Sequence, residues 1–382
     1  MKIIVLGGDG YLGWATCMRL SNRGHSVLAV DNFSRRANSN KMDRVPLVQV
    51  PGLHIRARLW NSFGGQKIQY EIGDVTDYAF LSKLFEVETP DAVIHYAEQP
   101  SAPLSMVNQG WATETVRNNL MSTLNVVWAV KEKAPKCHII KLGTMGEYGT
   151  PNIDIEEGYL DVTHKGREHR FLYPKTPGSI YHLTKVHDSD LLYFATRVWN
   201  LAVTDLNQGP VYGIHTEELA ANPQFAPLFN YDDIFGTVIN RFVVQAVAGV
   251  PLTIYGTGEQ TRGYIDIQDT LQCVHIALKN PAQPGEFKVF NQFTETYNIG
   301  ELAYKVMCAA RQLGIAVIAQ NLENPRVEAE QHYYNPANSK FKDLGLVPHL
   351  LTPETLGGMI TYCLKHRANI RTDYFSPTVR WA

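Results

Sequence analysis

The sequence has few cysteines, and none of them has a close partner. Its five cysteines are scattered singly, without a Cys-x-x-Cys pair. This pattern argues against both a zinc site and a disulfide framework, so no metal is predicted. Long hydrophobic runs are also missing, because no apolar stretch reaches the ~18 residues that a bilayer span requires. Since the chain enters a strand directly, these absences predict a cytoplasmic protein without a targeting segment.

An excess of charge of either sign is missing as well. The chain carries 35 basic and 37 acidic residues, and its formal net charge is -2. Such a balance gives no reason to expect nucleic acid or an anionic membrane as a partner. The 382 residues, of which 45% are hydrophobic, are enough for one large α/β domain or for two lobes around a sizeable core.

A glycine pattern typical of dinucleotide binding follows the first short apolar run. Gly7, Gly10 and Gly13 have the spacing G-x-x-G-x-x-G, and a helix to about residue 23 and a strand over 25–30 come next. These glycines allow a tight turn and a close approach of the backbone to a pyrophosphate. The N-terminus of the helix would then face the phosphates.

An acidic residue ends the second predicted strand and favours one cofactor. The carboxylate of Asp31 would accept hydrogen bonds from the ribose hydroxyls of NAD and would repel the additional phosphate of NADP. Arg35 and Arg36 argue in the opposite direction, unless they cover the adenine face or contact solvent. We predict NAD.

Strands and helices alternate over the first 207 residues. Further strands are predicted over 67–72, 92–96, 137–142 and 201–205, and helices over 78–85, 111–133 and 181–200. This alternation predicts an α/β fold, a Rossmann-type doubly wound parallel sheet that binds ligands beyond the carboxyl ends of its strands. Residues 37–66 form a predicted insertion of unknown role, with a helical stretch over 53–63.

The alternation ends near residue 208. The remaining elements are predicted strands over 252–255 and 287–291 and helices over 232–248, 269–279 and 298–312. We therefore predict an NAD-binding domain over 1–207 and a smaller, mainly substrate-binding lobe over 208–382, from which some segments return to the first domain.

A Tyr-x-x-x-Lys pair is the main candidate for chemistry. Tyr181 and Lys185 lie four residues apart, so they share one face of a helix. A neighbouring ammonium group favours the phenolate, which lowers the pKa of the tyrosine and lets it act as a general base. Thr144 follows a buried strand and lies at the same predicted edge of the sheet.

The roles of three further polar residues are open. Asp74 either meets the adenine or caps the helix over 78–85. Asn118 and Asn119 lie within a long predicted helix, where asparagine is unfavourable, so one of them is expected to bond to a specific group.

These motifs resemble the extended short-chain dehydrogenase/reductases that act on nucleotide sugars. Longer segments are similar to the UDP-sulfoquinovose synthases within that superfamily, namely KLGTMGEYGTPNIDIEEGY, YHLTKVHDS, TDLNQGPVYG, YGTGEQTRGYIDIQDT, FNQFTE and NPRVEAEQHYYN. The resemblance covers nearly the whole chain. It implies a cytoplasmic, NAD-dependent enzyme, classed as a hydrolase, that converts UDP-glucose and sulfite to UDP-sulfoquinovose.

The resemblance also implies roles for individual residues. The implied catalytic residues are Thr144, Met145, Glu147, Tyr181, His182 and Lys185. The implied cofactor-binding residues are Gly7, Gly10, Tyr11, Leu12, Gly13, Asp31, Asn32, Arg35, Arg36, Asp74, Val75, Tyr96, Asn119, Tyr181 and Lys185. The implied substrate-binding residues are Gln99, Thr144, Asn207, Gln208, Tyr255, Gln260, Arg262, Arg326 and Glu328.

Several alternatives stay open at this point. Either Glu147 or His182 moves the proton at carbon 5 of the sugar, unless the first is a supporting carboxylate and the second a packed helix residue. Pro100 stands where plant-like relatives have an arginine that an anionic co-substrate would use. The rival functions are a UDP-glucose 4-epimerase or another nucleotide-sugar dehydratase, and an NAD-binding scaffold without activity. The family implies a homo-oligomer, a dimer or a tetramer.

Overall fold

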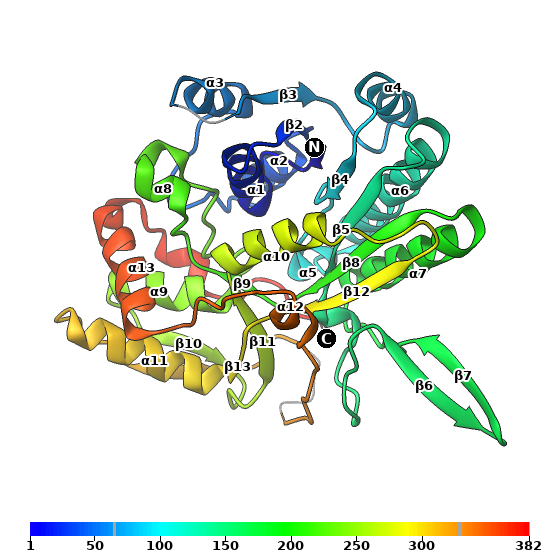
Figure 1. The fold of residues 1–382 in the computed structure, drawn as a ribbon. Coiled ribbons are helices and arrows are strands. Elements are labelled where there is room, and N and C mark those ends of the chain that lie inside the picture. The colour runs from blue at the N-terminus through cyan, green and yellow to red at the C-terminus, as the bar shows by residue number, and fades with distance from the viewer. Residues whose placement is uncertain (64–65, 327–330, 382) are drawn as a thin grey trace.

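A seven-stranded parallel sheet forms the centre of the molecule, with the strand order β12-β8-β5-β4-β1-β2-β3 (Figure 1). The computed structural model describes residues 1–63, 66–326 and 331–381. The strands of this sheet are β1 (Lys2–Leu6), β2 (Ser26–Asp31), β3 (Ile68–Ile72), β4 (Ala92–His95), β5 (His138–Thr144), β8 (Ala202–Gln208) and β12 (Phe287–Gln292). The order reverses after β3, which is the doubly wound topology that the alternation predicts.

Helices cover both faces of this sheet, because successive strand residues point to opposite sides. In β1, Ile3 and Val5 pack with α1 (Tyr11–Asn22), α3 (Leu53–Phe63) and α10 (Ile267–Lys279). Ile4 and Leu6 pack on the other face with α4 (Tyr78–Glu88), α6 (Gln109–Lys133) and α7 (Ile180–Trp199). α6 and α7 lie side by side on that face (Figure 1).

A second group of elements packs around its own apolar core, on the carboxyl side of the sheet. Its helices are α8 (Glu217–Ala221), α9 (Val238–Ala248), α11 (Ile299–Gln312) and α13 (Pro353–Lys365). Its strands are β9 (Val211–Tyr212), β10 (Leu252–Tyr255), β11 (Thr261–Asp266), β13 (Glu295–Asn298) and β14 (Ala319–Leu322). The predicted boundary at residue 207 stays a proposal.

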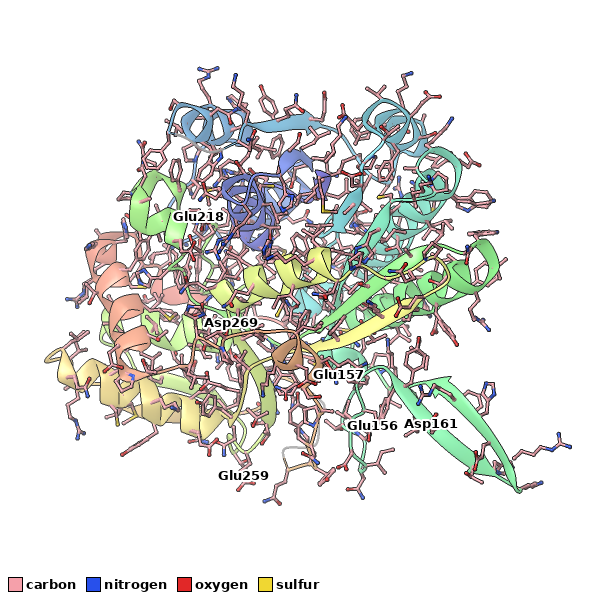
Figure 2. The ribbon with its side chains drawn as sticks, in the orientation of Figure 1. Glu156, Glu157, Asp161, Glu218, Glu259 and Asp269 are labelled. Carbon is pink, nitrogen blue, oxygen red and sulfur yellow. The ribbon has the colours of Figure 1, made fainter. Side chains whose placement is uncertain are left out.

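A hairpin that the sequence analysis did not predict projects from the body (Figure 1). It consists of β6 (Tyr159–His164) and β7 (Arg167–Leu172). At its base, Glu157 accepts hydrogen bonds from the backbone N–H groups of Asn291 (3.0 Å) and Lys340 (3.2 Å), while Asp161 lies out on the hairpin (Figure 2). The short elements are α2 (Ser34–Lys41), α5 (Ala102–Ser105), α12 (Lys340–Asp343) and the 3-10 turns η1 (Met145–Glu147), η2 (Pro223–Phe225), η3 (Arg367–Asn369) and η4 (Thr372–Phe375).

Most predicted elements are found within a few residues of their expected bounds, and the helix over 53–63 is confirmed. One expectation needs correction. The helix after β3 is capped by Asp77, whose carboxylate accepts from the N–H groups of Ala79 and Phe80, and not by Asp74. The strand near 287–291 is the edge strand of the large sheet, because β12 pairs in parallel with β8.

Among the described residues, no helix is long and apolar enough to span a membrane.

Candidate active site

A cavity of about 480 Å³ opens at the carboxyl edge of the large sheet. Its walls include Gly7 after β1, Asp31 at the end of β2, Thr144 at the end of β5 and Gln208 at the end of β8. Tyr255, at the end of β10, lies on the side of the second group of elements. Ligand sites of α/β folds lie at this edge and commonly have this size.

The glycine loop is shaped for close approach of another backbone. Gly7 has φ +85°, and a Cβ on it would lie 2.8 Å from the carbonyl carbon of Tyr96. A Cβ on Gly13 would overlap the carbonyl oxygen of Gly7. Gly10 is the N-cap of α1 and has no side chain to accept from the first turn, so the N–H groups of that turn are available to a ligand. This cradle fits the pyrophosphate of a dinucleotide.

Asp31 ends β2 beside this cradle. Its carboxylate accepts hydrogen bonds from the N–H groups of Asp9 (2.9 Å) and Phe33 (2.7 Å), which fix its orientation. Burial, together with the negative charge of Asp9, raises the pKa of Asp31 to about 6. Each carboxylate oxygen has a second lone pair for a ribose hydroxyl.

We expect the affinity for NAD to fall as the pH decreases through about 6, because a protonated Asp31 loses an acceptor. Calorimetric titration of the NAD-free protein between about pH 5 and 8 measures this affinity. The variant Asp31→Asn should bind more weakly and show little change over the same range. An affinity of the unaltered protein that is constant across this range would contradict the prediction.

The two arginines after β2 are both engaged by the protein. Arg36 forms an ion pair with Asp9 (Nε to Oδ2, 2.5 Å) and lies outside the cavity wall, so its contact with the cofactor stays a prediction. Arg35 lines the cavity, and its guanidinium lies 3.5 Å from the ring centroid of Phe235 and donates to Asn230 (2.9 Å). Both guanidinium groups are thus already paired within the protein and are not directed to the additional phosphate of NADP, which agrees with the predicted preference for NAD.

The predicted insertion contributes to the glycine loop. Arg56, from α3, is fully buried and forms an ion pair with Asp9 (Nη2 to Oδ1, 2.5 Å). The same Nη2 donates to the backbone carbonyl of Asp9 at 2.7 Å. The helix within 37–66 therefore holds the loop on which the pyrophosphate would rest.

The predicted catalytic residues come from two neighbouring elements. Thr144 ends β5, and Tyr181 lies in the first turn of α7, which Ser179 caps by accepting from the N–H of His182. Both Thr144 and Tyr181 line the cavity. Lys185 lies one turn after Tyr181, and its Nζ is 5.8 Å from the tyrosine ring centroid.

Lys185 uses two of its three N–H donors on the protein itself. Its Nζ donates to the carbonyl oxygen of Leu142 (2.7 Å) and forms an ion pair with Glu98 (2.5 Å). Burial, followed by the negative charge of Glu98, raises the pKa of Tyr181 above its ordinary value. The predicted lowering of this pKa by Lys185 is therefore wrong for the protein without ligands, because Glu98 balances the ammonium charge.

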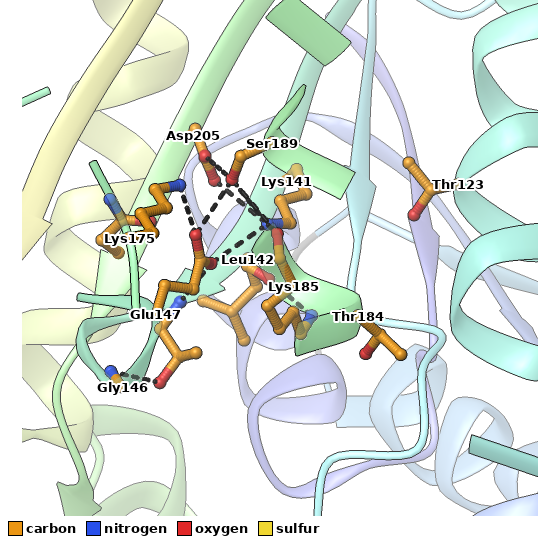
Figure 3. A network of polar contacts seen from close by, with 12 residues as sticks. Thr123, Lys141, Leu142, Gly146, Glu147, Lys175, Thr184, Lys185, Ser189 and Asp205 are labelled. Atoms are coloured by element: carbon orange, nitrogen blue, oxygen red, sulfur yellow. Dashed lines mark hydrogen bonds and ion pairs between the residues drawn. The ribbon is translucent and has the colours of Figure 1, made fainter. Parts of the chain in front are cut away.

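Glu147 belongs to a fully buried charge network behind the cavity (Figure 3). It accepts from the N–H of Thr144 and forms ion pairs with Lys141, from β5, and with Lys175. Although burial opposes it, the two ammonium groups hold the pKa of Glu147 below its usual range. Glu147 is thus an ionised carboxylate that supports the end of β5 and lies outside the cavity wall, which favours the second of its two expected roles.

His182 lines the cavity and is held in one orientation. Its Nδ1 lies 3.0 Å from the Oγ of Ser179, and its Nε2 faces Gly146, where an added Cβ would overlap the ring. Burial lowers the pKa of His182 to about 4, and the positive charge of Arg326 acts in the same direction. The imidazole is therefore neutral near pH 7 and can accept a proton.

Of the two asparagines in α6, one makes specific hydrogen bonds within the protein and the other lines the cavity. Asn119 is fully buried and bonds to the backbone N–H and carbonyl of Gln99 and to Thr184, so its specific partner is the protein itself. Asn118 lines the cavity instead. The side chain of Gln99 is used within the protein, because its Nε2 donates to the carbonyl oxygen of Ser101 and to the hydroxyl of Thr115 on α6.

The cavity thus collects most of the predicted residues but not all of them. Predicted residues on its wall are Gly7, Gly10, Tyr11, Leu12, Gly13, Asp31, Asn32, Arg35, Val75, Tyr96, Thr144, Tyr181, His182, Gln208, Tyr255, Gln260, Arg262 and Arg326. Predicted residues outside that wall are Arg36, Asp74, Gln99, Asn119, Met145, Glu147, Lys185 and Asn207. Glu328 lies outside the described residues.

Three of these exclusions have a direct structural cause. Asp74 closes a turn by accepting from the N–H and the hydroxyl of Thr76. Met145 is packed in a small apolar cluster with Tyr148 and its neighbours. Asn207 is fully buried and donates to the hydroxyl of Tyr148 at 2.8 Å.

Glu98 is one of two acidic residues on the cavity wall that were not predicted from the sequence, the other being Asp233. The position of Glu98 had the same signal as Asp31, an acid just beyond the carboxyl end of a buried strand.

The described residues contain no group of three or more metal-ligating side chains that could hold a metal ion.

Comparisons with known proteins agree with this architecture. Residues 3–300 match the model of the NAD dependent epimerase/dehydratase family. Among solved structures, UDP-glucose 4-epimerase from Thermotoga maritima with UDP-glucose has a TM-score of 0.70 at 20% identity and covers 96% of this chain and 99% of its own. The Bifidobacterium longum UDP-glucose 4-epimerase with NAD+ and UDP has a TM-score of 0.69 at 20% identity, with 97% and 100% covered. At these identities the likeness concerns the fold.

Two curated relatives of higher identity both carry the name of one enzyme within this broad family. The chloroplastic UDP-sulfoquinovose synthase of Spinacia oleracea is 47% identical over 380 residues, covering 100% of this chain and 79% of the relative. The UDP-sulfoquinovose synthase of Sulfolobus acidocaldarius is 42% identical over 384 residues, covering 100% of this chain and 98% of the relative. The expected hydrolase class has no support in these names. The chain belongs to the NAD-dependent epimerase/dehydratase family and, within it, to the UDP-sulfoquinovose synthases.

Proposed function

We propose that this protein converts UDP-glucose and sulfite to UDP-sulfoquinovose. One observation carries the proposal: the hydroxyls of Thr144 and Tyr181 belong to residues on the wall of the same cavity as the glycine loop. NAD, which the glycine loop and Asp31 would hold, would supply the acceptor for the hydride of carbon 4 and the hydride for the last step. The remaining chemistry is assigned to side chains of this chain.

Tyr181 is the proposed base for the first step. Its phenolate takes the proton of the 4-hydroxyl as the hydride leaves carbon 4, and Thr144 donates a hydrogen bond to the same sugar oxygen. Because burial raises the pKa of Tyr181, this step should speed up as the pH rises. In the last step the phenol returns the proton to the oxygen at carbon 4.

His182 is the proposed acid and base of the elimination. The 4-ketone acidifies the proton at carbon 5, and water leaves from carbon 6 once that proton is removed. His182 faces the cavity as a neutral imidazole, whereas Glu147 is paired with two lysines outside the wall. Sulfite then forms its carbon–sulfur bond at carbon 6, and carbon 5 takes up a proton.

We expect His182→Gln to separate oxidation from elimination. The variant should still reduce bound NAD on addition of UDP-glucose, because Tyr181 is unchanged, but it should form sulfonated product at least about 100-fold more slowly. Absorbance of the reduced nicotinamide and mass spectrometry of the sugar nucleotide measure the two steps separately. Glu147→Gln tests the carboxylate in the same two measurements. Product formation at the unaltered rate in His182→Gln would rule out the imidazole as the acid and base.

Two arginines on the cavity wall are the proposed contacts of the UDP phosphates. Arg262 belongs to β11 and Arg326 follows β14. Planar guanidinium groups bind phosphate oxygens in pairs, which suits a diphosphate. Tyr255 lies on the same wall and is the proposed neighbour of the uracil.

The decisive experiment follows the sulfur atom. The purified protein with UDP-glucose and isotopically labelled sulfite should yield UDP-sulfoquinovose that carries the label, seen by mass spectrometry. UDP-galactose alone would identify an epimerase, and NAD binding without any 4-keto sugar would identify a scaffold.

We also propose that the protein forms a dimer through α6 and α7. Apolar side chains are exposed on the outer faces of both helices, namely Val116, Met121, Leu183, Phe194 and Val198. Light scattering should give twice the chain mass of 42.9 kDa, and Phe194→Glu should shift the particle toward one chain. A cytoplasmic location stays a prediction, since one of the two relatives is chloroplastic by name.

A further inference from the structure

Glu98 is a buried acid whose bonding is incomplete. It follows β4, its side chain is 2% exposed, and it lines the cavity. Its Oε2 forms an ion pair with Lys185 at 2.5 Å, and apart from this contact neither oxygen accepts a hydrogen bond from any described residue. Buried carboxylates normally fill their lone pairs with donors, so this one has acceptor capacity left for a ligand.

The groups around Glu98 do not supply the missing donors. His95 has its Nε2 at 3.6 Å, but burial lowers the pKa of His95 to about 4, and this nitrogen already pairs with Thr123. Asp188 is fully buried nearby, and burial, followed by the charge of Glu98, raises the pKa of Asp188 well above its ordinary value. Lys141 lies farther back, among Glu147 and other carboxylates.

Lys185 has one donor to spare. An ammonium group carries three N–H donors. One is used by the carbonyl oxygen of Leu142 and one by Glu98, which leaves a single N–H. A ligand at this point therefore meets one donor from Lys185 and free acceptor lone pairs on Glu98.

The position of Glu98 indicates which ligand this is. The loop that carries it packs against the glycine loop, because a Cβ on Gly7 would lie 2.8 Å from the carbonyl carbon of Tyr96 and 3.0 Å from the nitrogen of Ala97. Glu98 therefore lies on the cofactor side of the cavity. A ribose of the cofactor carries two neighbouring hydroxyls, each of which can both donate and accept, so it matches the groups that Glu98 and Lys185 offer.

We propose that Glu98 is an additional contact of the cis-diol of the nicotinamide ribose, next to Lys185, whose binding of the cofactor the family resemblance already implies. Lys185 donates to one hydroxyl, and Glu98 accepts from the other. Glu98 is then a cofactor-binding residue in addition to the counter-ion of Lys185. This inference rests on the proposed function only in so far as the protein binds NAD.

The test is NAD binding in the absence of UDP-glucose and sulfite. Calorimetry on NAD-free protein compares the unaltered chain with Glu98→Gln and Glu98→Asp, and exposed Glu114→Gln is the control. We expect Glu98→Gln to weaken NAD binding about 10- to 100-fold, because a hydrogen bond to a charged acceptor is lost, and Glu114→Gln to leave it unchanged. Glu98→Asp keeps the charge at a shorter reach and should fall between them.

A cofactor analogue separates a direct contact from a general loosening of the site. NAD with both nicotinamide-ribose hydroxyls replaced by hydrogen should bind more weakly than NAD to the unaltered protein, and this difference should shrink in Glu98→Gln. The proposal is overturned if Glu98→Gln binds NAD normally, or if the analogue loses the same factor in both proteins. Neither result depends on which sugar nucleotide is turned over, so failure of the proposed reaction would be seen separately.

Discussion

The variant Tyr181→Phe should keep its fold and its NAD but lose the oxidation of UDP-glucose. The phenol is the proposed proton acceptor at carbon 4, and phenylalanine fills the same volume without it. General-base catalysis of this kind contributes about 10²- to 10⁴-fold, so turnover should fall by that factor. Rapid measurement of reduced nicotinamide after addition of UDP-glucose reports the step directly.

Tyr193→Phe is the matched control, because Tyr193 lies on the same helix but packs with the core beneath the sheet. It should turn over normally. The dependence of turnover on pH is an independent test. The base works only when it is deprotonated, and burial raises the pKa of Tyr181. Turnover by the unaltered protein should therefore increase with pH. Normal turnover by Tyr181→Phe would show that another group takes the proton.

The variant Lys141→Met should unfold far more easily than the unaltered protein. Lys141 is fully buried in β5 and donates to Glu147 (3.4 Å) and to the backbone carbonyl of Lys185 (3.2 Å), and its Nζ lies 3.5 Å from Asp205 (Figure 3). Although burial disfavours the charge, the carboxylates of Asp205 and Glu147 hold the pKa of Lys141 above its usual value. Removing one partner of such a network leaves buried charges uncompensated, which costs about 3 to 5 kcal/mol.

Chemical denaturation of the purified variants measures this difference in the free energy of unfolding. Lys83→Met is the control, because Lys83 and Glu86 form an exposed pair, for which about 0 to 1 kcal/mol is typical. The double variant Lys141→Met/Asp205→Asn should recover part of the loss, since one of the unpaired carboxylates is then neutral. Equal stability of Lys141→Met and Lys83→Met would contradict this account.

The cofactor half of the site was predictable because its signals are local. Gly7, Gly10, Gly13 and Asp31 lie within one strand–helix–strand unit, so their spacing alone places them around a pyrophosphate and a ribose. Tyr181 was predictable for the same reason, since a four-residue separation on a helix is a local property.

The buried charges could not be predicted, because their partners are distant in the sequence. Glu98 and Lys185 are brought together by β4 and α7, and Arg56 reaches Asp9 from a separate helix. The expected lowering of the tyrosine pKa failed on this point, since the spacing that predicts the lysine carries no information on its counter-ion.

The sequence by itself determined the family, the doubly wound sheet, the glycine cradle and the tyrosine on α7, because each follows from motifs and periodic patterns that are local in the chain. Only the tertiary structure decided that Asn118 rather than Asn119 lines the cavity, that Glu147 is a supporting carboxylate, and that Glu98 is paired with Lys185. These choices depend on which polar groups meet once apolar faces are packed and water is excluded, and in that setting a charge takes its properties from its neighbours in space.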